Sequence, residues 1–224
     1  MTMLQNKYNI SDHKSNKFSK NYSPIFLKIS NEDDLFRFDR LIQAHSEIII
    51  VDEIMSQLQD LIKLRNPTVR LSEHEMKTMI SKHLGKQSID AYGTWVYFIW
   101  SNKMVHILDE KEFIEVKTSR NKNKITKEEQ DILSTKKIGV IGLSVGQSVA
   151  ATLAMERDFG EIRLADFDTL ELTNCNRIRT PIYNLGLSKA IITAREIAEL
   201  DPYLKVVCYL DGVTPGNIED FIHK

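Results

Sequence analysis

The chain has 224 residues, of which 42% are hydrophobic and 27% charged, so it has globular composition with room for one large domain or two small ones. Its 30 Lys and Arg residues balance 31 Asp and Glu residues to a net charge of -1, which excludes a global basic field that would attract nucleic acid or an anionic membrane. Cys175 and Cys208 form no CxxC pair and are too few for a disulfide framework or a four-cysteine zinc site. We therefore expect no metal site of this kind and a reducing, cytoplasmic setting.

The N-terminal segment, residues 1–24, is polar and basic and lacks the apolar core of a signal peptide. We expect it to form a flexible tail. The longest apolar runs, residues 48–51 and 95–100, are far shorter than the roughly 20 residues that a bilayer-spanning helix needs. The sequence thus predicts no membrane segment.

Residues 25–116 mix helix and strand patterns and predict a small α+β module. Ser72 and Glu75 have the spacing of a helix capping box, and Gly85 has the position of a helix stop. The expected elements are a strand at 25–27, helices at 32–44, 52–65 and 73–84, a strand at 48–51, a hairpin of 95–100 with 104–108, and a further strand at 113–116.

Residues 117–127, rich in Lys and Arg, predict an exposed basic linker to a second domain, residues 128–224. A capping box of Thr126 and Glu129 starts a short helix there. Strands are then expected at 138–141, 162–165 and 205–210, and helices at 145–153, at 188–200 and from Thr214-Pro215 onward. This alternation predicts part of a Rossmann-like, doubly wound parallel sheet.

A glycine turn, Gly142-Leu143-Ser144-Val145-Gly146-Gln147, separates the first of these strands from its helix. Such a turn brings a phosphate to backbone N–H groups at the positive end of a helix. Compared with G-x-G-x-x-G, Ser144 and Gln147 replace two glycines and Gly146 comes one place early. A phosphate-binding turn and a tight turn without a ligand therefore both remain open.

The same residues read Gly-x-Ser-x-Gly, the nucleophile elbow of α/β-hydrolases. A hydrolase needs an acid and then a histidine downstream, but the only histidine after Ser144 is His223, the penultimate residue. We expect Ser144 to be a turn residue near phosphate and not a nucleophile.

The second strand ends in Asp166-Phe167-Asp168, and Asp166 follows Gly142 by 24 residues. That spacing is close to the one at which an acid binds the ribose of a nucleotide. Asp168 has three open interpretations: a magnesium ligand, a partner that orients a basic group, or a solvated loop acid.

Two further motifs follow, N-x-N-R at Asn174 to Arg177 and G-x-x-K-A from Gly186 with its lysine at Lys189. The ordered set of motifs, from about Thr126 to Lys224, resembles the adenylating domain of the ThiF/MoeB/HesA family, relatives of ubiquitin-activating enzymes. The resemblance implies ATP-dependent adenylation of a carboxylate with release of pyrophosphate. It also implies that the acceptor is the C-terminus of a ubiquitin-like or sulfur-carrier protein.

The resemblance also implies roles for individual residues. Asp166 would bind the ribose, and Asn174, Arg177 and Lys189 the phosphates. Arg177 and Lys189 would be catalytic, because a guanidinium fork and a point charge both stabilise phosphate oxygens. The remaining nucleotide-binding candidates are Gly142, Ser144, Gly146 and Asp168.

Some residues depart from the family pattern. Ile178 stands where a glutamine usually follows the motif arginine, Arg179 is an additional cation, and Arg120 is a loose candidate for the family's arginine near the start of the domain. Cys175 lies inside the N-x-N-R motif and is not expected to form a thioester, and Cys208 is expected in the core.

The resemblance places a magnesium-binding aspartate beyond Lys224, so we expect ATP binding but little ATP–pyrophosphate exchange by these residues. An open sheet edge predicts self-association, as a homodimer or a larger assembly. Two other functions remain open: a non-catalytic nucleotide-binding or protein-interaction module, and an NAD-dependent oxidoreductase, which would use Asp166 but not Lys189.

Overall fold

The computed structural model describes residues 20–223, which form two compact units. Residues 24–125 form one unit, and the described residues on either side of them form the other. Within residues 20–223, no helix is both long enough and apolar enough to cross a membrane.

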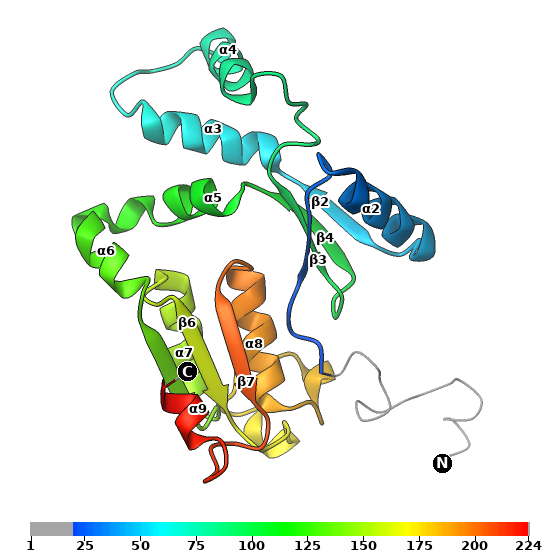
Figure 1. Cartoon of the computed structure of the whole chain (residues 1–224), viewed down its shortest axis with the longest axis vertical. Coiled ribbons are helices and arrows are strands. Elements are labelled where there is room, and N and C mark those ends of the chain that lie inside the picture. The colour runs from blue at the N-terminus through cyan, green and yellow to red at the C-terminus, as the bar shows by residue number, and fades with distance from the viewer. Residues whose placement is uncertain (1–19, 224) are drawn as a thin grey trace. The chain divides into compact units, whose positions relative to one another are not determined.

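The unit of residues 24–125 contains a four-stranded sheet in the order β1-β3-β4-β2. Strands β1 (Ile25–Leu27), β3 (Thr94–Phe98) and β4 (Lys103–Ile107) pair antiparallel, whereas β2 (Ile49–Asp52) runs parallel to β4. The helices are α2 (Glu32–Ala44), α3 (Ile54–Arg65), α4 (Glu73–Leu84) and α5 (Glu110–Lys117) (Figure 1). The expected mixture of helices and strands, with the capping box of Ser72 and Glu75, is confirmed.

The strand expected at residues 113–116 is wrong, because this segment lies inside helix α5. Its Phe-Ile-Glu-Val sequence alternates over too few residues to distinguish a strand from a helix. In the structure Phe113 and Val116, three residues apart, pack against the cluster formed by Leu58, Leu61 and their neighbours. Spacing of three residues puts both side chains on one face of a helix.

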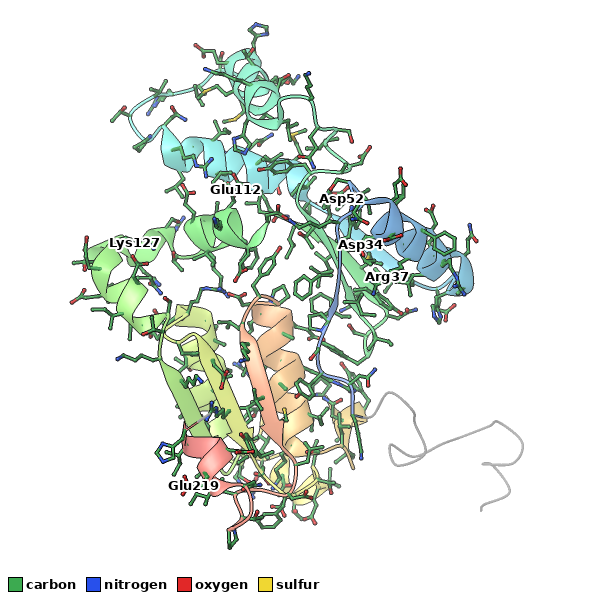
Figure 2. All side chains as sticks on the ribbon, in the orientation of Figure 1. Asp34, Arg37, Asp52, Glu112, Lys127 and Glu219 are labelled. Carbon is green, nitrogen blue, oxygen red and sulfur yellow. The ribbon has the colours of Figure 1, made fainter. Side chains whose placement is uncertain are left out.

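A buried histidine fastens the edge strand β2. The side chain of His106, on β4, is fully buried and stacks on Trp95, with ring centroids 4.2 Å apart. Its Nδ1 lies 3.0 Å from Oδ1 of Asp52, the last residue of β2 (Figure 2), and its Nε2 lies 2.6 Å from the carbonyl oxygen of Tyr92. Because a carbonyl only accepts, Nε2 carries a proton. The ring therefore links β2 to the loop before β3.

The predicted basic linker contains helical turns. Helix α5 ends at Lys117, a 3-10 helix spans Ser119–Asn123, and α6 spans Lys127–Leu133. The capping box of Thr126 and Glu129 starts α6 as expected. The division between the two units falls between residues 125 and 126, inside this segment.

The second unit contains a three-stranded parallel sheet in the order β5-β6-β7. The strands are β5 (Lys137–Ile141), β6 (Glu161–Ala165) and β7 (Lys205–Tyr209), with α7 (Gly146–Glu156) and α8 (Lys189–Leu200) as the crossover helices (Figure 1). The last helix, α9, spans Ile218–His223 and begins later than Thr214-Pro215. The predicted Rossmann-like, partial doubly wound sheet is confirmed.

Alternation along the strands divides this sheet into two faces. Ile138 and Val140 of β5 pack into the core formed with α7 and α8. Gly139, between them, faces the other way, and a Cβ at this position would come within 2.7 Å of the Phe221 ring on α9. Helix α9 thus lies on the opposite face from α7 and α8, and contacts it closely because residue 139 is glycine.

The predicted tail, residues 1–24, ends in ordered contacts, whereas its first 19 residues lie outside the described part of the chain. The carbonyl oxygen of Asn21 accepts a hydrogen bond of 2.7 Å from Arg195 Nε on α8. Tyr22 packs against two apolar clusters of the second unit, beside Cys208. The end of the segment is therefore anchored, and the expectation of a tail through residue 24 is too long.

A buried charge network fixes α9 to the sheet. Glu161 accepts hydrogen bonds from Arg163 Nε at 2.7 Å and Lys205 Nζ at 2.6 Å, and Arg163 Nη1 donates to the carbonyl oxygens of Asp220 and Phe221. Burial raises the pKa of Glu161, but Lys205 and Arg163 outweigh it and hold this pKa below its usual 4.5.

We predict that Glu161→Gln lowers the free energy of unfolding at neutral pH by about 1–3 kcal/mol, because two charge-assisted hydrogen bonds weaken. A carboxylate with a depressed folded pKa stabilises the protein above its unfolded pKa, and this contribution disappears as the pH falls through the folded pKa. Urea unfolding across pH should therefore show the difference between wild type and variant shrinking below pH 4.5. Glu128→Gln, at an exposed position of α6, is the control. If the difference in free energy of unfolding between wild type and Glu161→Gln stays constant as the pH falls, the prediction is contradicted.

Candidate functional site

Several of the residues singled out from the sequence lie close to the ends of parallel strands. The glycine turn follows β5, Asp166 to Asp168 follow β6, and Lys189 begins α8. The carboxyl edge of a parallel sheet is where doubly wound proteins bind ligands.

The geometry of the turn explains its unusual glycine spacing. Gly142 has φ +82, a left-handed conformation that favours glycine, and no atom within 4 Å would meet a Cβ there. Gly146 starts α7, and a Cβ at Gly146 would lie 2.6 Å from Val140 Cγ1. Gly146 thus provides the close helix–strand packing that the last glycine of G-x-G-x-x-G provides.

Asp166 connects the turn to the end of β6. One carboxylate oxygen accepts from the backbone N–H of Leu143 at 2.6 Å, and the other accepts from that of Asp168 at 2.8 Å. The residue is 7% exposed. Because each carboxylate oxygen has two lone pairs, both oxygens can accept one further hydrogen bond. Asp166 can therefore hold the turn and bind a ligand hydroxyl at the same time.

Lys189 brings three elements together. Its Nζ lies 2.8 Å from Asp168 Oδ2 and 3.3 Å from Ser144 Oγ, and its side chain is 5% exposed. A buried ammonium requires a partner, and Asp168 provides it. Since Lys189 is paired with a carboxylate, it acts at Ser144 as a hydrogen-bond donor and not as a proton acceptor.

Asn174 and Arg177 make contacts within their own loop. Asn174 is buried at the end of a 3-10 helix (Leu172–Asn174), and its Oδ1 accepts from the backbone N–H of Glu171 at 3.0 Å. The exposed Arg177 donates from Nη1 to Thr173 O at 3.2 Å and Asn176 Oδ1 at 3.0 Å. These bonds do not join either residue to Lys189 or Asp166.

Ile178, one of the departures from the family pattern, belongs to the core. Its side chain is 4% exposed and packs in the cluster with Leu170, Leu187, Ile191 and Ile192. The replacement of a glutamine by isoleucine therefore anchors the loop next to Arg177 through burial of apolar surface.

Sequence reasoning treated Gln147 only as a missing glycine. In the structure its side chain is buried on α7 and donates from Nε2 to Arg179 O at 3.0 Å and to Glu196 Oε2 at 2.7 Å. Gln147 shares the buried stripe of Ala150, Ala151 and Ala154, at helical spacing. A long polar residue on an otherwise small, apolar stripe was the signal that could have revealed this contact.

Within residues 20–223, no group of three or more His, Cys, Asp or Glu side chains is arranged to hold a metal ion. Asp168, one possible ligand, is paired with Lys189 instead.

Cys208 has the environment of a core residue. Burial raises the pKa of its thiol to about 12, and Sγ lies 3.6 Å from the carbonyl oxygen of Ala190. Because the thiolate is the reactive form of cysteine, a thiol with this pKa is inert at neutral pH.

The architecture of the second unit places it in the doubly wound α/β class. Residues 118–224 match the model of the ThiF family. The glycine turn, strand-end aspartate, asparagine–arginine loop and buried lysine, on which the resemblance was recognised, all lie within this segment.

Curated relatives match different shares of the chain. "Uncharacterized protein MT1398" of Mycobacterium tuberculosis (strain CDC 1551 / Oshkosh) is 37% identical over 199 residues, 88% of this chain and 25% of the relative. The tRNA threonylcarbamoyladenosine dehydratase of Escherichia coli (strain K12) is 35% identical over 86 residues, 38% of this chain and 32% of the relative. Ubiquitin-like modifier-activating enzyme 5 of Drosophila willistoni is 30% identical over 88 residues, 39% of this chain and 22% of the relative.

The chain therefore spans between 22% and 32% of the length of these relatives. A crystal structure of the E. coli dehydratase in complex with ATP aligns with a TM-score of 0.45 and 28% identity, over 48% of this chain and 45% of that chain.

We predict that Ser144 is not a covalent nucleophile, because Lys189 donates a hydrogen bond to its Oγ and the only histidine that follows it is His223, the penultimate residue. A fluorophosphonate probe should label neither the wild-type protein nor the Ser144→Ala control. Labelling of wild type that Ser144→Ala abolishes would make a hydrolase the better interpretation.

Proposed function

We propose that the ThiF segment binds ATP and, in the whole protein, activates a carboxylate as an acyl-adenylate with release of pyrophosphate. The observation that carries this proposal is the buried ammonium of Lys189, 3.3 Å from Ser144 in the glycine turn that Asp166 holds. This arrangement combines a cation, exposed turn backbone and a hydroxyl-binding carboxylate at one edge of the sheet.

Each part of the site has a role in nucleotide binding. The remaining lone pairs of Asp166 accept the ribose hydroxyls. The turn after Gly142 lies at the N-terminal, positive end of α7, where phosphate oxygens bind. Lys189 and Ser144 bind a further phosphate oxygen, and Asn174 positions the loop that carries Arg177.

Adenylation needs mainly charge stabilisation and positioning. An oxygen of the acceptor carboxylate forms a bond to the α-phosphorus, and the bond from that phosphorus to the bridging oxygen of the β-phosphate breaks. Pyrophosphate leaves with the electron pair. Lys189 and Arg177 stabilise the charge that develops on the phosphoryl oxygens. To do so, the exposed Arg177 side chain leaves its hydrogen-bond partners in the loop and binds the nucleotide.

The acceptor that we propose is the C-terminal carboxylate of a ubiquitin-like or sulfur-carrier protein. The similarity to a ubiquitin-like modifier-activating enzyme supports a protein acceptor. The balanced charge of the chain, -1 overall, favours a protein over a nucleic acid, because RNA binding depends on a basic surface. We also propose a cytoplasmic setting, since Cys175 and Cys208 are both free thiols.

A second candidate is a non-catalytic module that binds a nucleotide or a protein. The ion pair of Asp168 with Lys189 favours it, because phosphoryl transfer from ATP generally uses a divalent cation and this carboxylate is engaged by a lysine. An NAD-dependent oxidoreductase is less well supported, since hydride transfer has no use for Lys189. ATP–pyrophosphate exchange by the full-length protein distinguishes the adenylating enzyme from the module.

We predict that Asp166→Ala weakens ATP binding at least tenfold, equivalent to about 1.4 kcal/mol, because charge-assisted hydrogen bonds to the ribose are lost. Calorimetric titration measures this affinity. Equal ATP affinities for variant and wild type would reject the assignment of Asp166.

A second ligand distinguishes two roles of Asp166: its hydrogen bonds to the ribose and its hydrogen bond to the backbone of the glycine turn. Wild type should bind ATP more tightly than 2′,3′-dideoxy-ATP, and Asp166→Ala should no longer distinguish them. If the variant weakens both ligands by the same factor, Asp166 acts only through the turn.

We further propose that the protein forms a homodimer through β5, an edge strand of the sheet within the described residues, whose last residue, Ile141, is 66% exposed. Ile141→Lys should shift the mass measured by light scattering toward the monomer, because a charged side chain on an edge strand disfavours edge-to-edge pairing. Ile222→Lys, at another exposed apolar position, should leave the mass unchanged. A monomeric wild type would contradict the proposal.

A further inference from the structure

Three side chains and one carbonyl form a closed set of contacts behind the candidate site. Gln147 Nε2 donates to Arg179 O at 3.0 Å and to Glu196 Oε2 at 2.7 Å. The other oxygen of Glu196 lies 3.5 Å from Arg179 Nη2. Gln147 is 3% exposed, so its amide is committed to these partners and not to water.

These contacts connect the elements that carry the candidate phosphate-binding groups. Gln147 lies in the first turn of α7, directly after the glycine turn. Glu196 is on α8, which Lys189 begins. Arg179 is two residues after Arg177 in the loop between β6 and α8.

Arg177 therefore projects from a loop that is held on both sides. Before it, Asn174 caps its own short helix, and after it, Ile178 is buried and Arg179 O is bound by Gln147. The exposed guanidinium can reorient, while the backbone that carries it is fixed relative to α7 and α8.

We propose that Gln147, together with Glu196, is a positioning residue that holds the Arg177 loop against the nucleotide site. This inference rests on the proposed function for its consequence, ATP binding, but the loop contact itself is independent of any ligand. Gln147 stands at the position of the last glycine of G-x-G-x-x-G. Because Gly146 already provides the close helix–strand packing, Gln147 is available to hold the Arg177 loop.

Limited proteolysis tests the contact without a ligand. Trypsin cleaves after Arg177 and Arg179 only when the loop opens locally. Gln147→Leu should speed this cleavage about fivefold, the effect of losing one to two buried hydrogen bonds. Glu196→Ala should have the same direction, and provides a second variant if Gln147→Leu does not fold. Ser148→Leu, an exposed neighbour on α7, should cleave as wild type does.

A double-mutant cycle on ATP affinity tests the positioning role. Gln147→Leu should weaken binding about fivefold in wild type but not in an Arg177→Ala background, because it acts through Arg177. An equal loss of ATP affinity in both backgrounds, or unchanged cleavage in both Gln147→Leu and Glu196→Ala, would overturn the proposal. Faster cleavage with no ATP binding by wild type would instead reject the nucleotide function and leave only the loop contact.

Discussion

The carboxylate of Asp166 is the contact on which the arrangement of the site depends. Its two oxygens accept from the backbone N–H groups of Leu143 and Asp168, so one side chain sets both the turn after β5 and the bend after β6. The bend places Asp168 against Lys189, and Lys189 in turn reaches Ser144. The candidate ligand-binding edge of the sheet is thus organised by contacts within the protein, which lowers the cost of ordering it on binding.

Most of the fold could be predicted because local patterns and long-range packing agree. Capping boxes at Ser72 and Thr126 and the alternation of strands and helices after residue 137 specify elements that the structure contains. The prediction of a strand at residues 113–116 was wrong because a pattern of four residues fits a strand and a helix equally well. Packing against α3 favours the helix. The prediction of a flexible tail through residue 24 was too long for a related reason. Tyr22 stands among polar residues in the sequence, and only the structure shows that its side chain packs into the second unit.

Parts of the candidate site could be located from the sequence where a residue's place follows from its position after a strand, and were missed where that place follows from tertiary contacts. Asp166 and the glycine turn are recognisable from spacing alone. Gln147 is not, because its partners, Arg179 and Glu196, are 32 and 49 residues away in the sequence. The same applies to Asp168, for which three interpretations were open until its pairing with Lys189 was seen.

Calorimetric titration of the protein with ATP, AMP and NAD, under identical buffer conditions, tests the central claim most directly. A site built from Asp166, a glycine turn and the ammonium of Lys189 should bind ATP and AMP, and ATP more tightly, because the lysine contacts phosphate oxygens beyond the ribose. NAD should bind more weakly than either. Preferential binding of NAD, or no heat with any of the three nucleotides, would contradict the account.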